Sequence, residues 1–251
     1  MKTRCLEKSL SGRNASLPLI LFLLFCFASC LPCAHQAAAA DGAPTARYVL
    51  TLPHGKINAS WQKSGVPEID GFAEQKVKEE SGEFQERVRE LENALLSMNM
   101  EIPQCELNIT AAISSGGKTI GVLWAVYEYL GGNHGMLSLE SRIYSVSPVR
   151  DGKRTVKDLR FSDLFRNARA ALDVFSEHAR RELLAQGFDP AVVEPGTAPT
   201  AENFKVFLLT DQGLTLFFEP YQVASWADGT VRVNVPLEKL KPANPVLSYW
   251  K

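Results

Sequence analysis

The clearest pattern of apolar and polar positions lies in the last third of the chain. Two apolar runs, residues 204–209 and 214–218, flank the turn Asp211-Gln212-Gly213, whose glycine can adopt the positive φ that a hairpin turn needs. After an aromatic connection, apolar residues alternate with polar ones at Val231, Val233, Val235 and Leu237. A period of two places these four side chains on one face, so the sequence predicts antiparallel sheet.

Two other segments have the period of an amphipathic helix. Between residues 70 and 98, apolar side chains recur at steps of three and four, and Gly82 suggests a bend or a restart there. A second helix is expected to begin near Asp163, with Ser162 as its N-cap and Gly187 at its C-terminal end. Residues 187–200 contain three prolines and are predicted to be a surface loop.

Four further strands are expected, at residues 47–52, 105–113, 120–129 and 136–146. The pattern predicts an α+β fold, with antiparallel sheets of two hairpin groups packed with two main helices. A single domain is expected over residues 47–251, with an N-terminal part at 47–150 and a C-terminal part at 151–240.

The first 40 residues have the pattern of an export signal and tether. Four basic residues precede an apolar run at 17–27, which is shorter than the roughly 20 residues that span a bilayer. Cleavage is expected either before Asp41, after three alanines, or before Cys30, where residues 27–30 resemble a lipobox. The protein is therefore predicted to be periplasmic or extracellular, either soluble or lipid-anchored through Cys30, with no other membrane contact.

Net charge and cysteine content bear on the possible partners and on disulfide formation. Residues 1–40 hold 4 of the 27 basic and 1 of the 28 acidic residues, which leaves 23 basic against 27 acidic, a net charge of −4. Such mild acidity does not favour nucleic acid as a partner. Cys105 is expected to be a small buried hydrophobe, although a disulfide between Cys33 and Cys105 is an alternative in an oxidising compartment.

Three motifs carry a resemblance to a known family. They are Gly131-Gly132-Asn133-His134-Gly135, Ser162-Asp163-Leu164-Phe165 and the run from Phe218-Glu219-Pro220-Tyr221 to Trp226-Ala227. Over about residues 48–240 the chain resembles the extracytoplasmic domain of RsiV-type, lysozyme-responsive anti-sigma factors. That domain also stands in front of some peptidoglycan polysaccharide deacetylases, and Asn133 replaces the family's usual alanine. The resemblance implies an extracytoplasmic α+β domain. Together with the export signal it suggests a bacterial source, for which the glycosylation-type triplets at Asn14, Asn58 and Asn108 are coincidental.

Motifs for catalysis are weak. Gly116-Gly117-Lys118-Thr119 lacks the first glycine of a phosphate-binding loop and opens a strand, so nucleotide binding is not expected. Neither a metal site nor a cofactor is predicted, because no histidine has further ligands at workable spacing. Asp211, Glu219 and Asp228 are expected to be solvated acids beside turns.

Three residues are candidates for ligand contact: His134, Tyr221 and Trp226. The glycines around His134 predict a backbone turn that the imidazole fixes by hydrogen bonding, although ligand contact and catalysis remain open. Aromatic rings in a connection suit either the core or an interface with a sugar or a protein. The sequence thus favours a non-catalytic cell-envelope binding module for a lysozyme-like protein or a peptidoglycan fragment. The alternative is a hydrolase or accessory domain acting on cell-wall polysaccharide.

Overall fold

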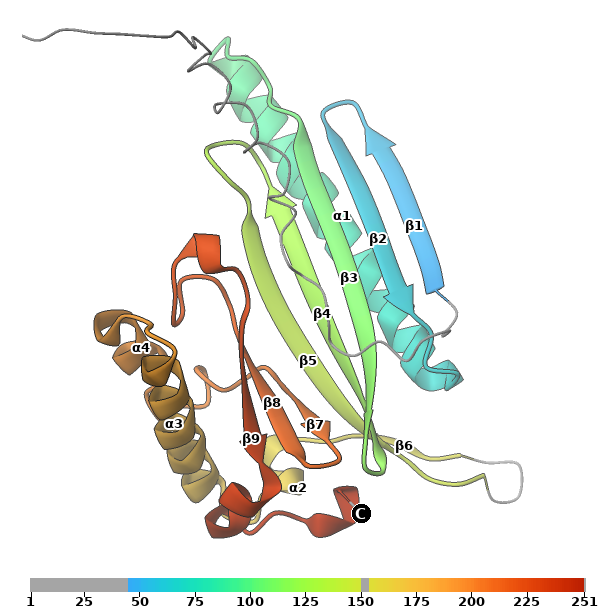
Figure 1. Cartoon of the computed structure of the whole chain (residues 1–251). Coiled ribbons are helices and arrows are strands. Elements are labelled where there is room, and N and C mark those ends of the chain that lie inside the picture. The colour runs from blue at the N-terminus through green and yellow to red at the C-terminus, as the bar shows by residue number, and fades with distance from the viewer. Residues whose placement is uncertain (1–44, 150–153, 251) are drawn as a thin grey trace, which may run out of the picture. The chain divides into compact units, whose positions relative to one another are not determined.

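A computed structural model describes residues 45–149 and 154–250 of the chain (Figure 1). The predicted export signal, both expected cleavage sites, Cys30 and Cys33 lie outside these residues. The described part is α+β, as predicted, with a six-stranded sheet ordered β1-β2-β3-β4-β5-β6 and a three-stranded sheet ordered β7-β8-β9. Within it, no helix combines the length and the apolar character needed to cross a bilayer.

The large sheet contains two strands that the sequence did not predict. Its members are β1 (Thr45–Leu52), β2 (Gly55–Gln62), β3 (Cys105–Gly116), β4 (Thr119–Tyr129), β5 (Met136–Val146) and β6 (Val156–Asp158). Strand β2 escaped notice because Lys56, Asn58 and Ser60 are poor strand formers. Since a helix connects β2 to β3, these two strands run parallel, which corrects the expectation of purely antiparallel sheet.

Helix α1 (Pro67–Ser97) covers one face of the large sheet (Figure 1). Six of its residues are buried at steps of three and four: Ile69, Ala73, Val77, Ser81, Phe84 and Val88. The helix continues through Gly82 without the predicted bend or restart, and the open space around Gly82 makes no demand on its backbone.

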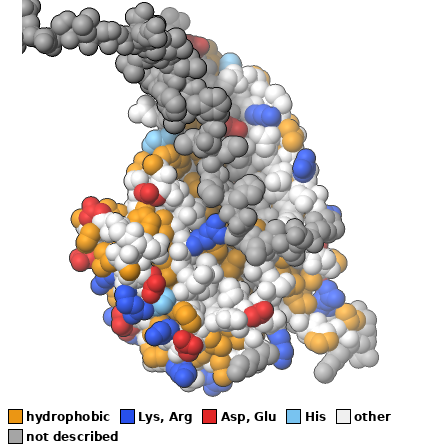
Figure 2. All heavy atoms as spheres, viewed as in Figure 1, with side chains coloured by type: hydrophobic (Ala, Val, Ile, Leu, Met, Phe, Trp, Pro, Cys, Tyr) orange, Lys and Arg blue, Asp and Glu red, His pale blue; other side chains and the backbone are white. Residues whose placement is uncertain are grey.

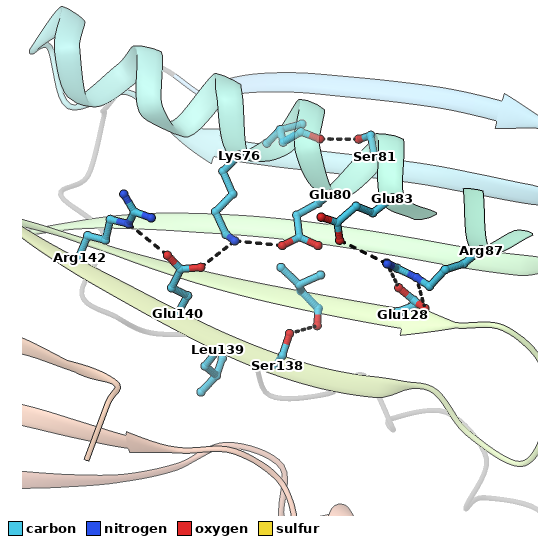
Figure 3. A network of polar contacts seen from close by, with 12 residues as sticks. Lys76, Glu80, Ser81, Glu83, Arg87, Glu128, Ser138, Leu139, Glu140 and Arg142 are labelled. Atoms are coloured by element: carbon cyan, nitrogen blue, oxygen red, sulfur yellow. Dashed lines mark hydrogen bonds and ion pairs between the residues drawn. The ribbon is translucent and has the colours of Figure 1, made fainter. Parts of the chain in front are cut away.

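Charged side chains fix α1 to the sheet at two points (Figure 3). Lys76 Nζ lies 2.7 Å from Glu140 Oε2 on β5, and Arg87 binds both carboxylate oxygens of Glu128 on β4. Burial alone would raise the pKa of Glu140, but Lys76 and Arg142 together hold it below its usual range.

The remaining described residues, from α2 onward, form the small sheet and its helices. These elements are α2 (Phe161–Leu164), α3 (Ala168–Ala185), α4 (Pro190–Gly196), β7 (Phe207–Thr210), β8 (Gly213–Phe218), β9 (Val231–Pro236) and the 3-10 helices η1 (Trp226–Asp228), η2 (Leu237–Ala243) and η3 (Leu247–Tyr249). Ser162 is not the cap of the long helix. That helix begins at Ala168, and its cap is Asn167, whose side chain accepts a hydrogen bond from Ala170 N.

The predicted surface loop at 187–200 is also corrected. Gly187 does follow α3 with a φ of 90°, but α4 then begins at Pro190. Asp189 starts this short helix by accepting a hydrogen bond from Ala191 N, and Val193 anchors it in the core. Proline at the first helical position is compatible with a helix, which is why a proline-rich stretch gave a misleading loop signal.

Strand β5 contributes to two separate cores. Its even-numbered residues Glu140 and Tyr144 face α1, whereas Leu139 and Ile143 face the small sheet. The backbone N–H of Phe207 on β7 donates to Ser141 Oγ at 3.0 Å, which links the small sheet to β5. The two layers thus meet on the face of β4 and β5 that α1 leaves open.

The predicted inward face of β9 is confirmed for Val231, Val233 and Val235, which are all buried, whereas Leu237 lies beyond the strand and begins η2. Replacing Val233 with Asp should unfold the protein or destabilise it by several kcal/mol, on the order of the cost of an unpaired buried charge. The control is Asn234→Asp, on the exposed face of the same strand, which should change stability by less than about 0.5 kcal/mol. Thermal unfolding of both variants tests this, and equal effects would contradict the assigned register.

Tyr144 makes a second prediction possible. It is 0% exposed, and its hydroxyl has no hydrogen-bond partner among the described residues, so burial raises its pKa to about 12. In the unfolded chain a tyrosine ionises near pH 10, so the stability that neutral Tyr144 contributes is complete below about pH 10 and is lost as the pH rises towards 12.

The matched variant is Tyr144→Phe. It should lie within about 1 kcal/mol of the wild type at pH 8, because it removes an unpaired hydroxyl. At pH 11 it should retain stability that the wild type has lost. Urea unfolding at pH 8 and pH 11 measures the free energy of unfolding of both proteins. Equal losses of stability between the two pH values would show that Tyr144 does not titrate with unfolding.

Candidate functional site: an aromatic cluster between two connections

The structure brings the three predicted contact residues together. His134 lies in the connection between β4 and β5, and Tyr221 and Trp226 lie in the connection between β8 and β9. The His134 and Trp226 rings stack with centroids 4.7 Å apart and planes 17° apart, and the Tyr221 ring lies 6.2 Å from each of them. We call these three side chains the aromatic cluster.

The glycines position His134. Gly131 and Gly132 have φ values of 101° and 93°, which a residue with a side chain rarely adopts. At Gly135 the constraint is space, because an added Cβ would lie 2.4 Å from the carbonyl oxygen of Glu128. The predicted backbone turn is therefore present, and the Tyr129 hydroxyl closes it by donating to Gly132 O at 3.0 Å.

The connection that carries Tyr221 and Trp226 is anchored on both sides. Phe218 and Val223 are fully buried, and Asp228 Oδ2 accepts hydrogen bonds from both the backbone N–H and the hydroxyl of Ser225, immediately before Trp226. Tyr221 has a φ of 70°, which is uncommon for a large side chain. Backbone strain of this kind persists only where surrounding contacts enforce it, and it occurs often at functional sites.

Hydrogen bonds also favour one tautomer of the His134 ring. Its Nδ1 lies 2.9 Å from the Gly135 carbonyl oxygen, which can only accept, so Nδ1 carries the hydrogen in the neutral ring. Nε2 then accepts a hydrogen bond from the Tyr221 hydroxyl at 3.1 Å. Tyr221 remains 53% exposed and Trp226 is half-buried, so the cluster presents aromatic surface to solvent instead of filling the core.

A cleft of about 450 Å³ adjoins the other side of His134. Its walls include three carboxylates, Glu80, Glu83 and Glu128. The sequence did not single them out, because Glu80 and Glu83 lie on α1, far from His134 in the chain, and Glu128 stands in a strand without a local motif. Each has a cationic partner (Figure 3): Lys76 binds Glu80, and Arg87 binds both Glu83 and Glu128. The Arg87–Glu128 pair joins α1 to β4, whereas Glu80 and Glu83 pair with cations four residues away on α1 itself.

Of the three acids expected to be solvated beside turns, Asp211 and Asp228 are exposed and Glu219 is half-buried, and all three also accept hydrogen bonds. Asp211 accepts from Gly117 N at 2.8 Å, and Asp228 binds Ser225 as described. Glu219 Oε1 accepts from Leu139 N at 2.7 Å while Oε2 pairs with Lys205 at 3.2 Å. Glu219 therefore joins the connection that carries the cluster to β5, a role that no local pattern signals.

Other candidates have structural surroundings. The Gly116-Gly117 turn joins two strands, as expected, and Lys118 N donates to Tyr249 O. Cys105 is a buried free thiol, in line with the favoured interpretation, and burial raises the pKa of its thiol. Within residues 45–149 and 154–250 no group of three His, Cys, Asp or Glu side chains is placed to hold a metal ion.

Coupling inside the aromatic cluster is testable by a double-mutant cycle on His134→Ala and Trp226→Ala. Stacked rings contribute about 0.5–1.5 kcal/mol beyond area burial, so the two losses of stability should be non-additive by about that amount. Chemical denaturation of wild type, both single variants and the double variant gives the coupling. Additive losses would show that the stack is absent in solution.

Comparisons with known proteins agree with this fold. Residues 162–238 match the family described as "Protein of unknown function (DUF3298)". A stretch of 137 residues, 54% of the chain, is 28% identical to the peptidoglycan-N-acetylmuramic acid deacetylase PdaC of Bacillus subtilis and spans 28% of that protein's length.

Two crystal structures of DUF3298 family proteins are similar in fold. One, from Pseudomonas aeruginosa PAO1, superposes with a TM-score of 0.53 at 15% identity, over 82% of this chain and 98% of that one. The other, from Bacteroides fragilis NCTC 9343, has a TM-score of 0.50 at 15% identity, over 84% and 98%. The described chain thus shares the α+β fold of solved DUF3298 proteins, and residues 162–238 carry the sequence match to that family.

Proposed function

We propose that this chain is a non-catalytic binding module of the cell envelope and that the aromatic cluster is its ligand-binding surface. The observation that carries the proposal is the meeting of His134 and Tyr221, 87 residues apart in sequence, with Trp226 in one solvent-facing stack. A buried stack would need no function beyond packing. Aromatic rings held at the surface by a strained backbone are typical of contact sites for sugars and proteins.

The proposed location and ligand class rest on two further supports. The N-terminal pattern predicts export, either as a soluble protein or through a lipid on Cys30. The similarity to PdaC, a deacetylase of N-acetylmuramic acid in peptidoglycan, favours a wall component as the ligand. A lysozyme-like protein partner follows from the resemblance to RsiV-type domains and is the second ligand to test.

A hydrolase acting on cell-wall polysaccharide is the alternative function, and the cleft beside His134 is the observation that favours it. An imidazole and three carboxylates line this cleft. General acid and base catalysis needs groups free to exchange protons with a substrate. Glu80, Glu83 and Glu128 are instead held in ion pairs with Lys76 and Arg87, which favours a binding role over catalysis.

Co-sedimentation of the purified protein with peptidoglycan sacculi, and binding to lysozyme in parallel, test the proposal. Tyr221→Ala and Trp226→Ala should each weaken binding by about 2 kcal/mol, roughly 30-fold, as for an interface hot spot. Tyr48→Ala is the matched control, because Tyr48 is 37% exposed on β1, away from the cluster. Unchanged affinity in both cluster variants would contradict the proposed site.

The same preparations distinguish the alternative function. The binding module should release no soluble fragments from sacculi over hours of incubation. Release that disappears in a normally folded His134→Ala variant would establish the hydrolase instead.

A further inference from the structure

The face of the large sheet opposite α1 continues the aromatic cluster in a form suited to a carbohydrate chain. On β2 and β3, side chains alternate between two environments. Ile57, Ala59, Leu107 and Ile109 are buried beneath α1. Asn58, Asn108 and Thr110 therefore project from the opposite face. Thr110 is exposed there, and the two asparagines are half-buried. Figure 1 shows α1 on the other side of these strands.

The two asparagines form a pair across β2 and β3. They are in register, and Asn58 Nδ2 donates to Asn108 Oδ1 at 3.0 Å. This bond leaves one polar atom of each amide without a partner among the described residues. The Asn58 side-chain oxygen can still accept a hydrogen bond, and the Asn108 side-chain nitrogen can still donate one. An adjacent acceptor and donor complement neighbouring hydroxyl groups, each of which donates and accepts. This is the chemistry of a sugar ring.

Tyrosines extend the pair towards the cluster. Tyr127 on β4 is in register with Asn108, so Asn58, Asn108 and Tyr127 form a row that crosses two strand spacings, about 10 Å. The Tyr127 ring packs against Gly135, next to His134. Neighbouring Tyr129 holds the same turn through Gly132. Amides and then phenol rings thus lead along one face to the stack of His134 and Trp226.

The charged side chains on this face restrict the kind of ligand that it can bind. Arg47 on β1, Lys56 on β2 and Glu106 on β3 project from it, so neither sign dominates. A polyanion such as nucleic acid needs several cations to neutralise its phosphates, and a protein interface needs large buried anchors at its centre. Small polar side chains beside aromatic rings meet neither requirement but suit a neutral glycan.

We propose that the row Asn58–Asn108–Tyr127 is a glycan subsite and that a linear neutral oligosaccharide lies across it with one end on the aromatic cluster. The proposal rests on the proposed function, since it names the ligand class of the same surface. It goes further by assigning sugar-binding roles to two asparagines and a tyrosine outside the cluster. The length of the row favours a chain of several sugars over a single ring.

The test uses chitotetraose, a linear tetramer of N-acetylglucosamine, in a titration of the full chain followed by NMR and calorimetry. The side-chain amide resonances of Asn58 and Asn108 should shift on binding. The double variant Asn58→Ala/Asn108→Ala should bind about tenfold more weakly, as expected for two lost neutral hydrogen bonds. Asn93→Ala, the same change on the exposed side of α1, should bind as the wild type does.

The outcomes separate this inference from the proposed function. If the double variant keeps full affinity while Trp226→Ala loses it, the cluster binds the glycan and the asparagine subsite is wrong. If the wild type does not bind chitotetraose but binds sacculi or lysozyme through Trp226, the glycan subsite is likewise overturned while the binding module stands. Thermal unfolding of the double variant should match the wild type, and a misfolded double variant is replaced by Asn108→Thr, which keeps a strand-forming polar side chain.

Discussion

The two-sided packing of β4 and β5 is the constraint on which the rest of the structure depends. On one face Trp124 and Tyr144 pack under α1, and on the other Leu139 and Ile143 pack against the small sheet. Because side chains alternate with a period of two, a shift of one residue in β5 would exchange these two sets. The position of the small sheet on the large one is therefore determined by the register of β5. That position in turn decides which connections meet.

This constraint explains how a binding surface arises from connections that are far apart in sequence. The turn after β4 emerges at the same end of the molecule as the connection between β8 and β9, and Glu219 ties the second to Leu139 on β5. His134 and Trp226 then stack without being close in the chain. Figure 2 shows hydrophobic, charged and other side chains interspersed over the visible described surface, without one dominant charge. Binding through aromatic and neutral polar groups is consistent with such a surface.

Much of the fold follows from local patterns, and the failures have physical causes. Alternation at Val231, Val233 and Val235 identified β9 and its inward face, because one side of that strand is buried. Strand β2 was missed because Asn58 and Lys56 give it a polar face, and that face is where the glycan subsite is proposed. Helix α4 was missed because its two prolines resemble loop residues, although Pro190 stands at the helix start, where a proline is compatible with the helix.

The members of the cluster were predictable one by one, but their contacts were not. Flanking glycines and an aromatic connection drew attention to His134, Tyr221 and Trp226, whereas the stack depends on tertiary packing that no local pattern encodes. Glu219 and the Arg87–Glu128 ion pair show the same limit, since each depends on a partner from a distant element. The most direct measurement for the central claim is hydroxyl-radical footprinting of the protein free and bound to sacculi. The account predicts strong protection of Tyr221 and Trp226 with little change at Tyr48, and equal modification of all three in both states would contradict it.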